Sequence, residues 1–212
     1  MKHCKVCFNL IKKEGIYPII NRVSICQKCY NQFDVIYKKE KLGSVDTLFL
    51  YTYNDFMKKL IYQFKGCYDI ELKDIFLERF LFVLKFKYLG YYIVPVPSSI
   101  GDDQVREFNH VEKIFESLGL PLIRCLEKKD NIKQSNRKKK DREMIYNSLT
   151  INENGKRIKG KKILIVDDIY TTGNTLNSSI ELVKKYSPNV IKALIICKNC
   201  RNSVNFLDRK DF

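Results

Sequence analysis

The chain has 212 residues, which is enough for one well-buried core and a small additional module. Apolar residues make up 45% and charged residues 30%, and the absence of an apolar run of about 18 residues argues against a membrane-spanning helix. The net charge of +15 indicates an anionic partner such as nucleic acid, a phosphorylated metabolite or a membrane surface, although a lysine-rich proteome would also raise it. The N-terminal sequence "MKHCKVCFNL" has no apolar signal-peptide region, so we expect a cytoplasmic protein.

Two Cys-x2-Cys pairs stand near the N-terminus, at positions 4–7 and 26–29. This spacing is typical of zinc sites with four thiolates, because each tight turn offers two soft ligands. Disulfides do not persist in a reducing cytosol, which favours a metal over two disulfides. We therefore predict a structural zinc module over residues 1–33, with His3 as a bystander. The predicted ligands are Cys4, Cys7, Cys26 and Cys29.

The remaining cysteines carry weaker signals. Cys197 and Cys200 form a third pair that has no partner pair downstream. A redox dithiol is one interpretation, but we favour incidental thiols, with Cys197 in the core. Cys67 and Cys125 are expected to be ordinary buried residues.

Beyond the zinc module the pattern alternates between strands and helices. The stretch 34–44 carries little signal. Strands are predicted at 47–53, 91–97, 120–127, 161–168 and 190–198, and helices at 55–65, 69–87, 106–119 and 174–186. Asn54 or Asp55 would cap the first helix, and Gly119 would end the third. This order predicts a parallel α/β sheet with helices on both faces, as one domain over residues 34–212.

The stretch "ILIVDDIYTTGNTL" (163–176) carries the most chemistry. In open α/β sheets ligands bind at the carboxyl ends of strands, where Asp167 and Asp168 stand. The following loop enters a helix whose free amides favour an anion, and Gly173 would let the backbone approach a phosphate closely. Carboxylates repel phosphate, so they should face sugar hydroxyls or a shared magnesium ion. A ribose phosphate fits both requirements.

The same stretch resembles the phosphoribosyl pyrophosphate-binding motif of type I phosphoribosyltransferases. The resemblance implies a phosphoribosyltransferase-like domain in which Asp167 and Asp168, the catalytic pair, hold the ribose 2′ and 3′ hydroxyls. It also implies a loop around the 5′-phosphate, made of Thr171, Thr172, Gly173, Asn174 and Thr175. No residue stands out as a general base, which suits a reaction that depends on charge stabilisation of an oxocarbenium-like transition state.

A four-cysteine module ahead of such a domain resembles the ComF family of bacterial competence proteins, which act in natural transformation. Further matches are "VPVPSS" (94–99), "REFNH" (106–110) and "KQSNRKKKDR" (133–142). Glu107 and His110 depart from the family's glycine and glutamine, and we expect His110 to be structural rather than catalytic. The register after Arg142 departs as well, so no role is assigned to Asn147.

Positive charge gathers at 124–142, where nine Lys or Arg stand against three acidic residues, and again at 156–162. In the resembled enzymes the first segment is a loop that closes over the diphosphate. The same charges could follow a nucleic-acid backbone, or could simply be solvated. The predicted nucleic-acid contacts are Arg106, Arg137, Lys138, Lys139, Lys140 and Arg142. Exposed Tyr or Phe side chains could stack bases, but the sequence does not say which are exposed.

Three functions remain open. The favoured one is a competence protein that binds phosphoribosyl pyrophosphate with Mg²⁺ and handles incoming single-stranded DNA, in the cytoplasm or at the inner membrane face within a DNA-uptake complex. The second is an active phosphoribosyltransferase acting on a nucleobase-like acceptor with release of pyrophosphate. The third is an adaptor that docks a competence helicase or a recombination mediator.

Overall fold

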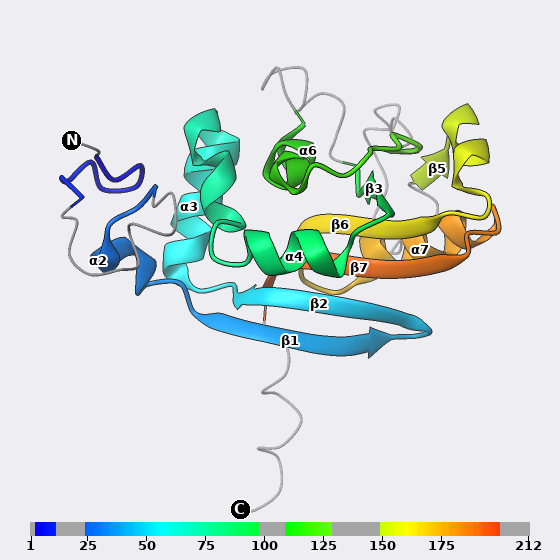
Figure 1. Ribbon diagram of the computed structural model, residues 1–212, viewed down its shortest axis with the longest axis horizontal. Helices are drawn as coiled ribbons and strands as arrows, with labels where there is room; N and C mark the ends of the chain where they lie inside the picture. Colours follow the sequence, from blue (N-terminus) through cyan, green and yellow to red (C-terminus); the bar gives the residue numbers. More distant parts are fainter. Residues whose placement is uncertain (1–2, 12–23, 98–108, 129–148, 200–212) are drawn as a thin grey trace, which may run out of the picture.

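The computed structural model describes residues 3–11, 24–97, 109–128 and 149–199 (Figure 1). Its centre is a five-stranded sheet in the order β1-β2-β7-β6-β3, in which β2, β7, β6 and β3 are parallel and β1 is antiparallel to β2. A separate pair, β4 and β5, is antiparallel. The strands are β1 Val35–Leu42, β2 Val45–Thr52, β3 Tyr91–Pro95, β4 Leu126–Lys128, β5 Leu149–Ile151, β6 Lys162–Tyr170 and β7 Val190–Lys198.

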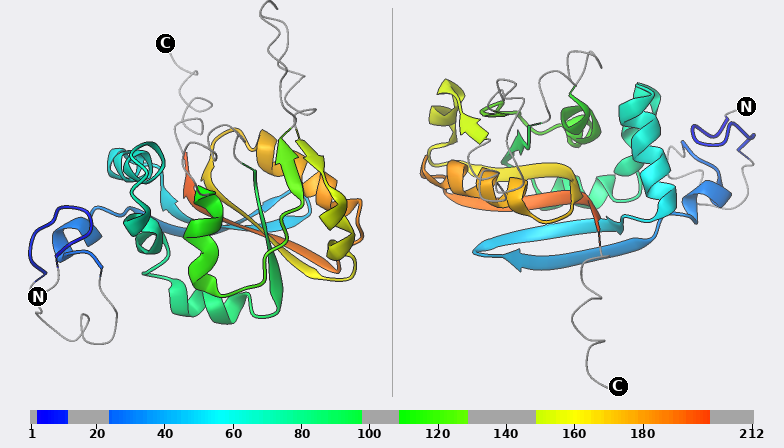
Figure 2. Two further views of the ribbon diagram at one scale, coloured as in Figure 1. Left: turned by 90° about the horizontal axis from the view of Figure 1, so that it is seen from above. Right: turned by 180° about the vertical axis from the view of Figure 1, so that it is seen from behind.

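Helices cover both faces of this sheet, as predicted. The α-helices are α2 Gln27–Tyr30, α3 Asp55–Gly66, α4 Leu81–Lys87, α6 His110–Phe115 and α7 Asn174–Lys184, and the 3-10 helices are η1 Ile70–Phe76, η2 Glu116–Leu118 and η4 Glu153–Ile158. Leu164 and Leu194 point into the apolar core under α3, α4 and α6, whereas Ile163 and Ile195 point into the core under α7. Figure 1 shows α4 in front of the sheet, and the right-hand view of Figure 2 shows α7 on the other side.

Most predicted elements are confirmed, and the differences have physical reasons. The stretch 34–44 is an edge strand, β1, whose exposed lysines conceal any apolar pattern; Gly43 makes its turn with a φ of 59°. The helix predicted at 69–87 is instead η1 followed by α4. The strand predicted at 120–127 forms only a bridge from Leu122 to Ile93 before β4, because Pro121 has no amide to donate to a ladder.

The described parts of the N-terminal module pack beside α3 and η1 (Figures 1 and 2). Cys4 and Cys29 belong to the same apolar core as Met57 of α3. Lys5 Nζ lies 3.3 Å from Glu71 Oε2, and the Ser24 amide donates to Glu78 Oε1 at 2.9 Å. The module therefore rests on the helical layer of the larger domain. Within the described ranges, no helix is long and apolar enough to cross a membrane.

Candidate functional site

The end of strand β6 forms the centre of the candidate site. The four residues from Ile163 to Val166 are completely buried, and β6 lies between β7 and β3. Because the strands on both sides run parallel to β6, their carboxyl ends open on the same edge. The acidic pair that follows Val166 is thus held at that edge, between β7 and β3, near the carboxyl end of β6 as the sequence predicted.

Asp168 is buried, with 4% of its surface exposed, and has a cation from another element as its partner. Lys65 Nζ, near the end of α3, forms an ion pair with Asp168 Oδ2, and His110 Nε2 lies 3.7 Å from the same oxygen. Burial by itself would raise the pKa of Asp168, but the nearby His110 imidazole and the charge of Lys65 hold that pKa well below its usual value. Asp168 is therefore the ionised member of the pair.

Asp167 has the opposite electrostatic character. Its Oδ1 accepts a hydrogen bond from the Asp168 amide at 2.9 Å. Burial and the neighbouring negative charge of Asp168 raise the pKa of Asp167 well above its usual value. The pair consequently offers one firmly ionised carboxylate and one that takes up a proton more readily. Such a pair can accept hydrogen bonds from two hydroxyl groups without carrying two full negative charges.

The loop after β6 has a backbone conformation that favours glycine at position 173. Gly173 has a φ of 78°, and a Cβ at this position would lie 2.5 Å from Tyr170 Oη and 2.9 Å from its ring. The Asn174 amide lies 3.5 Å from Thr172 Oγ1, and α7 begins at Asn174. The five predicted phosphate-loop residues, 171–175, thus gather around the N-terminus of an 11-residue helix. Free amides and the helix dipole favour an anion there.

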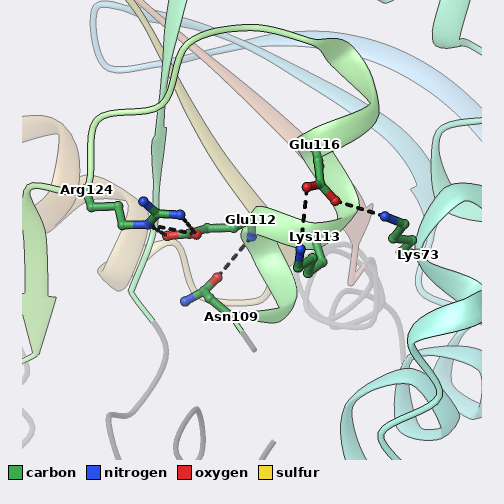
Figure 3. A network of polar contacts seen from close by, with 6 residues as sticks. All are labelled: Lys73, Asn109, Glu112, Lys113, Glu116 and Arg124. Atoms are coloured by element: carbon green, nitrogen blue, oxygen red, sulfur yellow. Dashed lines mark hydrogen bonds and ion pairs between the residues drawn. The ribbon is translucent and has the colours of Figure 1, made fainter. Parts of the chain in front are cut away.

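Helix α6 brings His110 to the acidic pair and is held by a polar network (Figure 3). The Asn109 side chain accepts from the Glu112 amide at 3.0 Å and caps the helix. Glu112 accepts from Nε and Nη2 of Arg124 at 2.7–2.9 Å. Farther along, Glu116 pairs with Lys73 of η1 at 2.9 Å and with Lys113 at 3.4 Å. These contacts fix α6, and with it the buried His110 imidazole.

Sequence reasoning missed Lys65 and did not expect His110 at the acidic pair. Lys65 is one lysine of an amphipathic helix, and nothing in its local pattern distinguishes it from exposed Lys58 or Lys59. His110 was expected to be structural, and its burial is consistent with that, but its imidazole faces Asp168. Only the packing of α3 and α6 over β6 reveals either contact.

A second candidate centre is the four-cysteine cluster in the N-terminal module. The Sγ atoms of Cys4, Cys7, Cys26 and Cys29 all lie within 4.8 Å of one another, and those of Cys7 and Cys26 are 3.6 Å apart. Zinc–sulfur bonds of about 2.3 Å in a tetrahedron require sulfurs roughly 3.8 Å apart, so the cluster fits a metal ion. A hydrogen bond from the Asn9 backbone is the main cause that lowers the pKa of Cys7 to about 7, whereas burial raises the pKa of Cys29.

Other cysteine predictions have mixed outcomes. Cys197 lies fully buried in β7, as expected, and burial raises the pKa of its thiol. Cys125 is buried as predicted, but Cys67 is exposed, which corrects the prediction for it, because it follows the last turn of α3. Cys200 lies outside the described residues.

Most of the basic segment 124–142, from residue 129 onward, also lies outside the described residues. This applies to Glu107, Asn147 and all six predicted nucleic-acid contacts, namely Arg106, Arg137, Lys138, Lys139, Lys140 and Arg142. The second basic cluster, 156–162, is described: it occupies η4 and the start of β6, at the opposite end of that strand from Asp168.

Comparisons with known proteins show what this chain is similar to. Residues 116–208 match the phosphoribosyl transferase domain family. The chain is 31% identical to competence protein ComFC of Streptococcus pneumoniae over 92% of this chain and 86% of that protein. It is 32% identical to competence protein ComFC of Bacillus subtilis over 83% and 75%, respectively. Among solved structures, adenine phosphoribosyltransferase of Saccharomyces cerevisiae aligns with a TM-score of 0.42 and 17% identity, covering 81% of this chain and 87% of that one.

Proposed function

We propose that this chain, which belongs to the ComFC family of competence proteins, binds phosphoribosyl pyrophosphate at the end of β6 and takes part in DNA uptake by binding single-stranded DNA. The observation that carries the first half is the acidic pair beside the Gly173 loop. Two carboxylates and a helix N-terminus stand next to each other, which suits a ligand with hydroxyl groups on one side and phosphate on the other.

In the proposed complex Asp167 and Asp168 accept hydrogen bonds from the ribose 2′ and 3′ hydroxyls. The loop residues Thr171, Thr172, Gly173, Asn174 and Thr175 surround the 5′-phosphate with amides and hydroxyls. Mg²⁺ would accompany the diphosphate and neutralise part of its charge. Lys65 supports this arrangement because its ion pair keeps Asp168 ionised and oriented before the sugar arrives.

The metal of the N-terminal module is proposed to be zinc. Four thiolates within 4.8 Å of one another suit a soft, tetrahedral ion with no open position. Such a closed site is structural, and it would hold the two Cys-x2-Cys turns together where too few apolar residues exist to do so.

The proposal for DNA depends on the family relationship and on charge. The chain carries a net charge of +15, which favours a polyanion. Its relatives of similar length are competence proteins. A cytoplasmic protein in this role would meet DNA as a single strand, alone or together with a helicase or a recombination mediator.

Isothermal titration of phosphoribosyl pyrophosphate with Mg²⁺ tests the ligand site. We expect binding to wild type and none to the double variant Asp167→Asn, Asp168→Asn. Glu181→Gln, which removes an exposed acid on α7, serves as the matched control and should bind as wild type does. Absence of binding to a folded, metal-loaded wild type would contradict the proposal.

An active phosphoribosyltransferase is the second candidate, favoured by the acidic pair at the strand end. It predicts release of pyrophosphate when a suitable acceptor is present. Incubation with phosphoribosyl pyrophosphate, Mg²⁺ and a set of nucleobases, followed by a pyrophosphate assay, separates this activity from binding alone. Pyrophosphate release that requires both an acceptor and Asp167 would establish it.

A further inference from the structure

Helix α4 presents an aromatic stripe to solvent. Phe82, Phe86 and Leu89 are 75%, 67% and 74% exposed, and the two phenylalanine rings lie 4.8 Å apart between centroids. Residues four apart lie on one face of a helix, so the rings stand one turn apart on the same side. Leu84 of the same helix is fully buried and anchors it to the sheet. The stripe is therefore an anchored surface that the described part of the chain leaves exposed.

Beside this stripe lies a cavity of about 310 Å³ with four lysines in its wall, between the end of α4 and the edge of the sheet. We call it the lysine pocket, after Lys39, Lys41, Lys87 and Lys192. Within the described residues, none of the four lies within 4.0 Å of a carboxylate oxygen. Glu40 also lines the cavity, but it pairs with Lys38 at 2.9 Å and with Lys198 at 2.6 Å.

The four ammonium groups are not balanced within the pocket. Asp46 is the other acidic residue in its wall, so the positive charge there exceeds the negative. Burial, the charge of Lys39 and the charge of Lys192 all lower the pKa of Lys87. A bound phosphate would relieve this repulsion, since one anionic group can contact several lysines at once.

The aromatic stripe and the lysine pocket adjoin at the end of α4, because Lys87 follows Phe86, ends the helix and lines the pocket. Figure 1 shows α4 in front of β7 and, in that view, above β2; these two strands contribute Lys192 and Asp46 to the pocket. Flat exposed rings stack unpaired bases, and lysines follow the phosphates that join them. A duplex hides its base faces, and a purely apolar protein partner has no use for four lysines.

We propose that single-stranded DNA binds along this surface, with bases stacked on Phe82 and Phe86 and a backbone phosphate in the lysine pocket. The inference rests on the proposed function. It assigns the DNA contact to α4 and the lysine pocket rather than to the segment 129–148. The surface is also separate from the acidic pair, because Asp46 and Lys192 lie near the amino ends of β2 and β7. Both ligands could therefore be bound at once.

Fluorescence anisotropy with an oligo-dT probe tests the aromatic contacts. We expect Phe82→Ala, Phe86→Ala to weaken binding at least tenfold, since each stack contributes to affinity. Phe82→Tyr, Phe86→Tyr keeps the ring faces and should bind as wild type does. Tyr62→Ala removes a 68% exposed aromatic on α3 and is the matched control, expected to change nothing.

The salt dependence of the same binding tests the lysines. Lys39→Gln, Lys192→Gln should reduce the slope of log K against log salt by about 0.7, which is the contribution of the one backbone phosphate that the pocket no longer neutralises. Lys58→Gln, Lys59→Gln removes two exposed lysines of α3 and should leave the slope unchanged. An equal slope in wild type and the pocket variant would exclude the lysine pocket as the phosphate site.

The outcomes separate this inference from the proposed function. If wild type binds oligo-dT and the alanine pair binds equally well, the surface is not the DNA site, although DNA binding itself stands. If wild type does not bind oligo-dT, the DNA part of the proposed function fails together with the inference, while the titration of phosphoribosyl pyrophosphate still decides the other part. An alanine pair that loses only self-association would assign the stripe to contacts between copies of the chain and overturn the inference.

Discussion

The two ends of the central sheet handle charge in opposite ways. At the carboxyl ends of the parallel strands, Asp168 is buried and has an ion-pair partner, Lys65, supplied by the chain itself. Near the amino ends, the four lysines of the lysine pocket have no carboxylate partner in the described structure. The first end is preorganised and nearly self-neutral, whereas the second has excess charge for an external anion to balance. The two proposed ligand sites therefore differ in electrostatic character and lie at opposite ends of the sheet.

Removal of the proposed metal should give the largest effect, a loss of hydrogen-exchange protection at the carboxylate end of the sheet but not at the lysine-pocket end. The N-terminal module packs on η1, beside α3, so a chelator or Cys4→Ser, Cys29→Ser should unfold the module and loosen the layer that carries Lys65. Structural zinc contributes on the order of 10 kcal/mol to the folding of small modules. Hydrogen exchange should rise sharply over residues 24–33 and stay unchanged at the start of β7. An equal loss of protection in residues 24–33 and at the start of β7 would show that the metal stabilises both ends of the sheet alike.

Gly173→Ala, at the carboxylate end of the sheet, should give the second-largest effect, a loss in the free energy of unfolding. A side chain there is strained by the φ of 78° and would also collide with Tyr170, so we expect a loss of about 3 kcal/mol. Gly119→Ala is the matched control: its φ is 68°, but nothing lies within 4 Å of the added Cβ. Backbone strain alone should cost it about 1 kcal/mol. Urea unfolding measures both, and equal losses would mean that the Tyr170 ring moves aside freely.

The two aspartates should respond in opposite directions when neutralised. Asp168→Asn removes the carboxylate that pairs with the partly buried Lys65 and should destabilise the protein by about 2 kcal/mol at neutral pH. Asp167→Asn should stabilise it, because burial and the charge of Asp168 oppose ionisation of Asp167. Urea unfolding of the two variants at pH 7 checks both signs, and a loss of stability in Asp167→Asn would contradict the second.

The pH dependence follows from the same shifts. Since folding raises the pKa of Asp167, wild-type stability should fall as the pH rises from the ordinary aspartate value of about 4 toward that raised pKa. The contribution of Asp168 has the opposite sign: its pKa is lowered, so its stabilisation is present above pH about 4 and is lost on acidification below it. Urea unfolding over pH should show the first effect disappear in Asp167→Asn. An unchanged profile would show that Asp167 ionises freely.

The smallest effect is expected at the lysine pocket. Lys39→Gln removes a charge that lowers the pKa of Lys87, so it should stabilise the protein by roughly 0.5 kcal/mol at low ionic strength. The gain should vanish at high salt, because screening already weakens the repulsion. Urea unfolding at both ionic strengths checks this. Destabilisation by the substitution would show that Lys39 has a structural role.

Much of the carboxylate end could be predicted from the sequence. The apolar run from Ile163, the acidic pair and the Gly173 loop are contiguous, so local pattern and turn chemistry identify them together. The two Cys-x2-Cys pairs are equally local, since each turn sets the spacing of its own ligands. β1 escaped prediction because an exposed edge strand buries little apolar surface and leaves a weak pattern.

By itself, the sequence determined the strand that ends in two carboxylates, the glycine turn into α7 and the four thiol ligands, because each is encoded by neighbouring residues. Tertiary structure alone decided that Lys65 and His110 meet Asp168, that Phe82 and Phe86 face solvent, and that lysines from β1, β7 and α4 share one cavity. These groups come together only when distant elements pack on the sheet. A lysine or phenylalanine has the same local pattern whether it is paired, buried or exposed, so its partner is set by long-range packing.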